Sequence, residues 1–277
     1  MRDSELKKAT DYSEGQREAA HRVLIEIANL LSAYAEDIRI IGGWVPGLLF
    51  PYGDHIGSID VDVLLNHEKI FIDSYENIER MLIRTGYKQH PEKYFSFIKP
   101  VEVEGVLYEV DVDFLAGKYG GTSIKKNSQH LQGIKALKAT GGNFAFEFPA
   151  EDIKIEAKRP DGAMDVGHVK VVSVLPFLVM KTAALNRQKP KDAYDIYYCI
   201  DKYDGGIRKL AEQFKPYKDR EIIKIMLTTL SEKFASEEHS GPVDIVSFLG
   251  ITETDEVERI KRDAFEKIAY LVTQLSK

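Results

Sequence analysis

The stretch "IDVDVLL", residues 59–65, decides the expected fold because acidic and apolar side chains alternate in it with a period of two. Such alternation predicts a β-strand whose two faces differ. Asp60 and Asp62 would project from the same face of this strand. One interpretation is an ordinary strand with a solvated face. The other is a metal site, since carboxylates are the ligands that hard divalent cations prefer.

The segments around this strand predict a sheet interleaved with helices. The capping-box pattern "SEGQ" (13–16) predicts the start of a helix, and "IRII" (38–41) predicts a buried strand before the Gly42-Gly43 pair. A helical pattern covers 71–86, and 94–100 and 105–117 are typical of antiparallel strands joined by a turn. Shorter segments predict a small helix at 44–50 and further strands at 144–148, 153–157 and 168–174.

The character of the chain changes after residue 173, where the remaining segments all follow a helical period. We therefore expect an α+β fold: a mixed sheet flanked by helices, followed by an all-helical C-terminal part. The expected division places the sheet in residues 1–173 and the helices in 174–277.

Composition excludes several classes of protein. The chain has 277 residues, of which 44% are hydrophobic, and a net charge of −6, which gives no overall attraction to nucleic acid or membrane. Cys199 is the single cysteine, so an internal disulfide is excluded and a cysteine-based zinc site is not expected. No apolar run approaches the roughly 18 residues of a membrane span, and the first residues lack a signal-peptide pattern. The expectation is a cytoplasmic protein without a membrane partner.

A second pair of acids, Asp111 and Asp113 in "YEVDVDFL" (108–115), repeats the same spacing. If the two strands are neighbours, three or four carboxylates converge, and their repulsion is relieved when a cation binds. Two such cations would stabilise the attacking and leaving oxygens of a phosphoryl or nucleotidyl transfer. Glycines before the first pair would let the backbone approach phosphates closely.

The motifs, in this order, resemble the DNA polymerase β-like nucleotidyltransferase superfamily. There, a Gly-Gly or Gly-Ser turn precedes a D-x-D strand, and a third acid follows on a later strand; "GGW" (42–44) and "GSIDVD" (57–62) match it. The segment "LPFLVMKTAALNRQKPKDAYDIYY" (175–198) is similar to the C-terminal signature of the AbiEii-like branch. That signature is a lysine-bearing helix, a basic turn and an Arg/Lys-Asp-x-x-Asp helix.

The resemblance implies a nucleotidyltransferase catalytic domain that uses two Mg²⁺ ions and an NTP substrate. It implies that Asp60 and Asp62 are metal ligands and that a third carboxylate completes the set, with Asp113 the better match and Asp111 the alternative. It also implies that the nucleotide's phosphates are held by four turn residues and a lysine, which match Gly42, Gly43, Gly57, Ser58 and Lys181. The acid of the following helix matches Asp192.

The helical motif also has an interpretation from the residues alone. Lys181 shares an apolar helix face with Phe177 and Leu185, so its ammonium must either meet an anion or extend to water. Asp192 in the first turn of the next helix serves the site or simply favours the helix dipole. His55 lies in the expected nucleotide loop, where it either contacts phosphate or, as the preferred interpretation, is an ordinary surface-loop side chain. Trp44 either stacks on a base or belongs to the core.

The acceptor is left open by the sequence. The AbiEii-like resemblance implies the toxin of a toxin–antitoxin or phage-defence pair, with tRNA as a possible acceptor and an antitoxin protein as partner. A lysine-rich stretch at 118–138 would support RNA contact. The alternatives are a small-molecule nucleotidyltransferase of the aminoglycoside-modifying type, which a net charge of −6 suits, and an inactive protein that only binds nucleotide.

Overall fold

A computed structural model describes residues 7–70, 77–117, 128–131 and 134–277, with the backbone alone for 128–131 and 134–135. The described chain divides into two compact units. The sheet unit comprises residues 13–51 and 57–176, and the helical unit comprises residues 7–12, 52–56 and 177–277. The change from one unit to the other after Pro176 falls close to residue 174, and two short earlier segments belong to the helical unit.

The sheet unit is built on a mixed sheet with the strand order β3-β4-β5-β2-β1-β9-β8, to which β7 adds beside β5 and β6 beside β7. The central pairs β2–β5 and β1–β9 are parallel and β1–β2 is antiparallel. The strands, in chain order, are β1 Ile38–Ile41, β2 Val61–Leu65, β3 Lys88–Gln89, β4 Ser96–Val103, β5 Val106–Ala116, β6 Ser128–Leu131, β7 Ile134–Lys138, β8 Glu151–Lys158 and β9 Met164–Val171.

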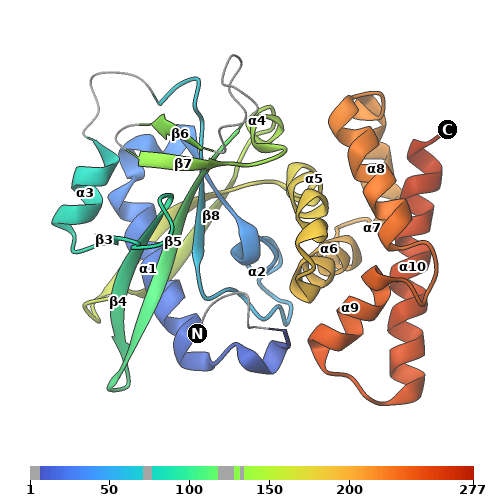
Figure 1. Cartoon of the computed structure of the whole chain (residues 1–277), viewed down its shortest axis with the longest axis horizontal. Coiled ribbons are helices and arrows are strands. Elements are labelled where there is room, and N and C mark those ends of the chain that lie inside the picture. Colours follow the sequence, from blue (N-terminus) through green and yellow to red (C-terminus); the bar gives the residue numbers. More distant parts are fainter. Residues whose placement is uncertain (1–6, 71–76, 118–127, 132–133) are drawn as a thin grey trace. The chain divides into compact units, whose positions relative to one another are not determined.

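Helix α1, Glu14–Leu30, packs across β4, β5, β8 and β9 and covers one face of the sheet (Figure 1). Ser13 caps it as the sequence predicts, because its hydroxyl accepts a hydrogen bond from the backbone of Gln16. Its inner side carries fully buried residues such as Val23 and Leu24. The other helical segments of this unit are η3 Ser32–Asp37, η4 Gly42–Trp44, α2 Val45–Leu49, α3 Ile78–Arg84 and α4 Gly142–Ala145.

The helical unit contains the C-terminal helices, and α5 starts in the last residues of the sheet unit. Helix α10 packs against α7, α8 and α9, with Phe214, Phe248 and Leu271 buried in this unit. No helix in the described part of the chain combines the length and hydropathy that a membrane crossing needs. The segments are η2 Ala9–Asp11, α5 Val174–Ala184, η5 Leu185–Arg187, α6 Pro190–Lys202, α7 Gly206–Phe214, η6 Lys215–Tyr217, α8 Glu221–Lys233, α9 Ser240–Leu249 and α10 Thr254–Leu275.

The predicted fold class is confirmed: the protein is α+β, with a mixed sheet, flanking helices and a helical C-terminal part. The helix expected at 71–86 is described from Ile78 to Arg84, and residues 71–76 lie outside the described residues. The strand expected at 144–148 is wrong, because α4 and a following turn take its place. The rings of Phe144 and Phe148 meet edge-to-face at 4.8 Å, the i, i+4 contact of a helical turn.

Candidate functional site

The four acids singled out in the sequence, Asp60, Asp62, Asp111 and Asp113, are called the acid cluster here. The condition set in the sequence analysis, that their strands are neighbours, is met, because β2 and β5 pair in parallel with Asp62 directly opposite Asp113. Asp60 lies immediately before β2. Since neighbouring strands are about 4.8 Å apart, side chains on one face of this pair are within reach of a shared ligand.

Asp113 is the electrostatically strained member of the acid cluster. Burial raises its pKa to about 7, the charge of Asp60 adds to the rise, and the nearby Ser96 hydroxyl and Lys93 oppose it. Ser96 is fully buried and lies directly opposite Asp113 on β4. Among the described residues, neither Asp113 Oδ1 nor Ser96 Oγ has a partner in hydrogen-bonding geometry. A buried carboxylate oxygen without a partner is costly in a folded protein.

Asp60 is held from two sides by residues of the preceding turns. The Ser58 hydroxyl donates to Asp60 Oδ1 at 2.5 Å, and Trp44 Nε1 donates to the Asp60 carbonyl at 2.8 Å. The Trp44 ring stacks on His21 with centroids 5.4 Å apart and lies beside Gly57. Ser58, expected at the phosphates, therefore orients a carboxylate in this structure, and Trp44 is part of the support of the acid cluster.

The glycine turns pack directly against the acids. Gly42 has a φ of +71°, which L side chains rarely adopt, and a Cβ there would collide with the Asp62 carboxylate. Gly43 is buried in the same η4 segment, and Gly57 has a φ of +80°. The Gly-Gly turn thus allows the backbone to approach the position of Asp62.

We expect Gly42→Ala to displace the Asp62 carboxylate and to destabilise the protein by more than Gly105→Ala does. Both glycines have positive φ, at +71° and +79°, so both variants carry the backbone cost of about 1 kcal/mol. A Cβ at Gly105 meets nothing within 4 Å, which makes it the matched control. Urea unfolding of the two variants measures the difference, and equal losses would contradict the contact between Gly42 and Asp62.

Lys93 is the member of this site that sequence reasoning missed. Its Nζ lies 2.5 Å from Asp111 Oδ2. Although burial alone lowers the pKa of Lys93, the hydrogen bond to Asp111 and the charge of Asp113 raise it. Lys93 stands in a turn between β3 and β4 without periodicity or motif, so no local signal identified it. The one clue was its position just before a strand predicted to pair with the Asp111–Asp113 strand.

The donor types of the acid cluster fit a hard divalent cation. Asp60, Asp62 and Asp113 supply carboxylate oxygens, the ligands of Mg²⁺, and Asp113 Oδ1 is buried without a hydrogen-bond partner among the described residues. As the side chains stand, no three histidine, cysteine, aspartate or glutamate residues of the described chain are grouped so as to hold a metal ion. In this arrangement Ser58 engages Asp60 and Lys93 engages Asp111.

Lys181 and Asp192, the two candidates of the helical motif, belong to an ion-pair cluster within the helical unit. Lys181 Nζ lies 2.7 Å from Asp192 Oδ1 and 2.8 Å from Asp195 Oδ2. Lys191 adds a second ammonium 2.9 Å from Asp195 Oδ1, and Arg187 contacts Asp192 at 3.2 Å. The side chains of Lys181, Asp192 and Asp195 are almost completely buried, so Lys181 meets anions rather than extending to water.

The ion-pair cluster keeps its charged forms despite burial. Burial by itself raises the pKa of Asp195, but the Lys181 ammonium and Lys191 lower it far below its ordinary range. Burial by itself likewise raises the pKa of Asp192, but the charge of Lys181 lowers it below its ordinary value. Burial lowers the pKa of Lys181, and the charges of Asp192 and Asp195 raise it above its ordinary value. The cluster is therefore a set of mutually dependent charges, in which each member compensates the burial of another.

His55 is a further residue whose environment the sequence did not reveal. The expected surface position is wrong, because the side chain is 1% exposed and its Nε2 lies 2.8 Å from Asp195 Oδ1. The ring stacks on Tyr194 at 5.2 Å and meets Tyr198 edge-on at 4.9 Å. Its partner is 140 positions away, so nothing in the neighbouring sequence indicates the contact.

We expect His55→Gln to weaken the acid sensitivity of the fold. Burial lowers the pKa of His55, the hydrogen bond to Asp195 partly opposes this, and the charges of Lys191 and Lys181 reinforce it. The unfolded chain then binds the proton more readily, so His55 reduces the free energy of unfolding as pH falls below about 6.5. Urea unfolding between about pH 8 and pH 5 should show a smaller loss in the variant than in the wild type. Parallel pH profiles would contradict this prediction.

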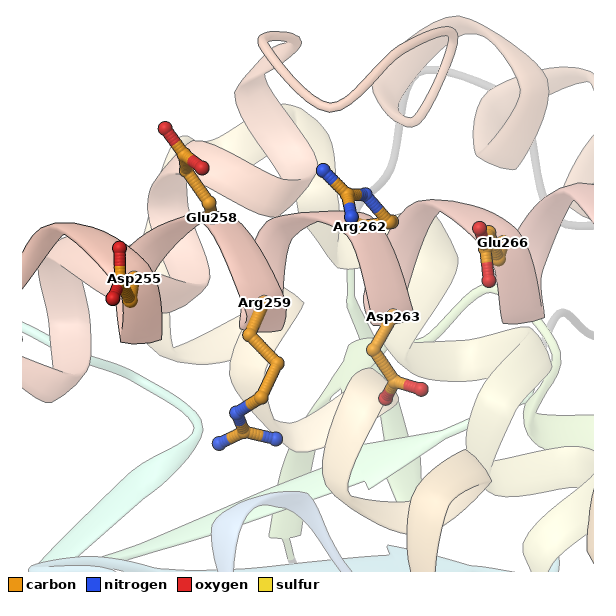
Figure 2. Close-up of a pocket in the computed structure, with 6 residues that line it drawn as sticks. All are labelled: Asp255, Glu258, Arg259, Arg262, Asp263 and Glu266. Atoms are coloured by element: carbon orange, nitrogen blue, oxygen red, sulfur yellow. The ribbon is translucent and has the colours of Figure 1, made fainter.

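The pocket drawn in Figure 2 is a separate feature on helix α10 and contains none of the predicted site residues. In that view Arg259 and Asp263 project from the same side of the helix. Asp263 also accepts a hydrogen bond from Tyr197 at 2.6 Å, which ties α10 to α6. Charged side chains of this one helix form its entire lining: Asp255, Glu258, Arg259, Arg262, Asp263 and Glu266.

The structure brings the predicted residues together in two groups, each within its own unit. The acid cluster lies in the sheet unit with Gly42, Gly43, Gly57 and Ser58, and Lys181 and Asp192 lie in the helical unit. Of the lysine-rich stretch, residues 118–127 and 132–133 and the side chains of residues 128–131 and 134–135 lie outside the described residues. No protein-family model, curated protein or solved structure matches this chain.

Proposed function

We propose that the protein is a metal-dependent nucleotidyltransferase, which moves NMP from an NTP to an acceptor hydroxyl. The observation that carries the proposal is the parallel pairing of β2 and β5, which sets Asp62 directly opposite Asp113. Asp60 lies two residues before Asp62, immediately before the start of β2. The raised pKa of Asp113 supports it, because ligand-binding sites are where buried like charges concentrate.

In this proposal Asp60, Asp62 and Asp113 hold Mg²⁺, and two ions are expected. Mg²⁺, when bound, supplies charge stabilisation for the reacting phosphate. Asp113, or Asp111 in its place, accepts the proton of the acceptor hydroxyl, whose oxygen forms the new bond to the α-phosphorus. The bond from that phosphorus to the β-phosphate bridging oxygen breaks, and pyrophosphate leaves with its electron pair.

The remaining roles follow the resemblance. Backbone N–H groups around Gly42, Gly43, Gly57 and Ser58 hold the phosphates, because turns in which successive backbone N–H groups point to one side bind anions in other proteins. The resemblance assigns Lys181 to the neutralisation of the triphosphate and gives Asp192 as a further acid of the site. The ion pairs of Lys181 with Asp192 and Asp195 hold its ammonium in a fixed position. The same ion pairs also stabilise the fold of the helical unit.

For the acceptor, we propose RNA, with tRNA as the first candidate, in the setting of a toxin–antitoxin or phage-defence pair. The second candidate is a cationic small molecule of the aminoglycoside type, which the net charge of −6 favours. Binding of nucleotide without transfer is the third. The acids present at every position of the D-x-D motif count in favour of catalysis.

The test is a transfer assay with Mg²⁺ and each α-labelled NTP, offered total RNA, a cell protein extract and a panel of aminoglycosides. Label should appear in one acceptor class and disappear with the Asp60→Asn/Asp62→Asn double variant. Label in the RNA, together with RNA binding that weakens as salt is added, would indicate RNA as the acceptor. Heat stabilisation by NTP with no labelled product from any acceptor would contradict the enzymatic proposal and support nucleotide binding alone.

A further inference from the structure

The turn between β3 and β4 holds the backbone of Lys93 in one place. His90 Nδ1 accepts hydrogen bonds from the backbone N–H of both Glu92 and Lys93, each at 3.0 Å. The Lys93 carbonyl accepts in turn from the Ser96 N–H at 3.1 Å and from the Gln89 side chain at 3.2 Å. Lys93 is thus supported by both flanking strands, so its position beside the acid cluster is built into the sheet.

Asp111 and Asp113 share a face of β5, and they differ in their contact with the ammonium of Lys93. The ammonium contacts Asp111 Oδ2, while Asp113, two residues further on, keeps a buried Oδ1 without a hydrogen-bond partner among the described residues. Asp113 is also the member that lies opposite Asp62. The two acids of this strand therefore have different surroundings, which the D-x-D pattern alone does not reveal.

We propose that Lys93 is a built-in cation of the acid cluster, which pairs with Asp111 and thereby leaves Asp113 as the third carboxylate for a divalent cation. Lys93 is a positioning residue, since it acts through the carboxylates. Its charge also relieves part of the repulsion in the cluster before a metal arrives, and opposes the metal's charge afterwards. The inference rests on the proposed function, and metal binding without nucleotide tests it separately from catalysis.

The test is a calorimetric titration of the full chain with Mn²⁺ alone, which measures the affinity for the metal. Lys93→Met removes the charge and keeps the aliphatic stem, so the variant should bind Mn²⁺ about tenfold more tightly than the wild type. Lys93→Arg keeps the charge and should bind like the wild type. Lys88→Met removes an exposed lysine of β3 as the matched control, and it should stay within about twofold of the wild type because solvent screens that charge.

Two double variants identify the third ligand. Lys93→Met/Asp111→Asn should bind Mn²⁺ about as the wild type does, because one charge of each sign is removed and Asp113 is kept. Lys93→Met/Asp113→Asn should lose binding. The reverse pattern would overturn the inference, because Asp111 would then be the ligand that Lys93 blocks.

The outcomes also separate this inference from the proposed function. Mn²⁺ binding that is unchanged in Lys93→Met overturns the role of Lys93 and leaves the metal site standing. Absence of binding in both the wild type and Lys93→Met overturns both. The rise in melting temperature on adding Mn²⁺ provides a second measurement and verifies that each variant is folded; it should be larger for Lys93→Met than for the wild type, and an equal rise would overturn the role of Lys93.

Discussion

Asp60→Asn and Asp62→Asn should each reduce nucleotidyl transfer by about 10³-fold or more. A metal-bound phosphate derives several kcal/mol of transition-state stabilisation from the cation, and each 1.36 kcal/mol corresponds to a factor of ten in rate. The amide of asparagine has nearly the same shape as the carboxylate but lacks its charge, so it leaves the strand and its packing in place. Initial rates with a saturating acceptor and a range of Mg²⁺ concentrations measure the loss.

The matched control for these variants is Glu109→Gln. Glu109 is an exposed acid of β5, two residues before Asp111 on the same face, and its replacement makes the same change from carboxylate to amide. Its transfer rate should stay within about twofold of the wild type, since solvent screens a charge at that position. Full activity in both the Asp60→Asn and Asp62→Asn variants would contradict the proposed mechanism, whatever the acceptor.

Lys181→Met should lower the free energy of unfolding by about 3–5 kcal/mol. The variant leaves Asp192 and Asp195, both almost fully buried, without the ammonium that contacts each of them. Removing one partner of a buried ion pair costs this much because the remaining charge stays desolvated and uncompensated. Lys191 and His55 still contact Asp195, whereas Asp192 keeps the largely exposed Arg187, so the main loss is expected at Asp192. Urea unfolding at neutral pH measures the change.

Arg187→Met is the control for this prediction. Its guanidinium contacts the same Asp192 but is 58% exposed, so its loss should cost less than about 1 kcal/mol. Adding Asp192→Asn to Lys181→Met should recover part of the lost stability, since the uncompensated charge is then gone. A Lys181→Met variant within about 1 kcal/mol of the wild type would show that these ion pairs are not needed for the fold.

Local pattern predicted a large part of the fold. The period-two alternation within residues 59–65 and 105–117 marked β2 and β5, and the capping box at Ser13 marked the start of α1. The turn at residues 104–105 and the helical C-terminal part followed from the same kind of signal. These features are set by residues within a few positions of one another, whose spacing is visible in the sequence.

The acid cluster was foreseen in part. The sequence by itself determined which carboxylates share a strand face, because side-chain direction on a strand depends on residue parity alone. Only the tertiary structure decided that Asp62 lies opposite Asp113 and that Lys93 pairs with Asp111. It also decided that His55 is buried against Asp195, 140 positions away. Strand order and such long-range contacts arise when distant segments pack together, and the residue spacing within one segment does not specify its partner.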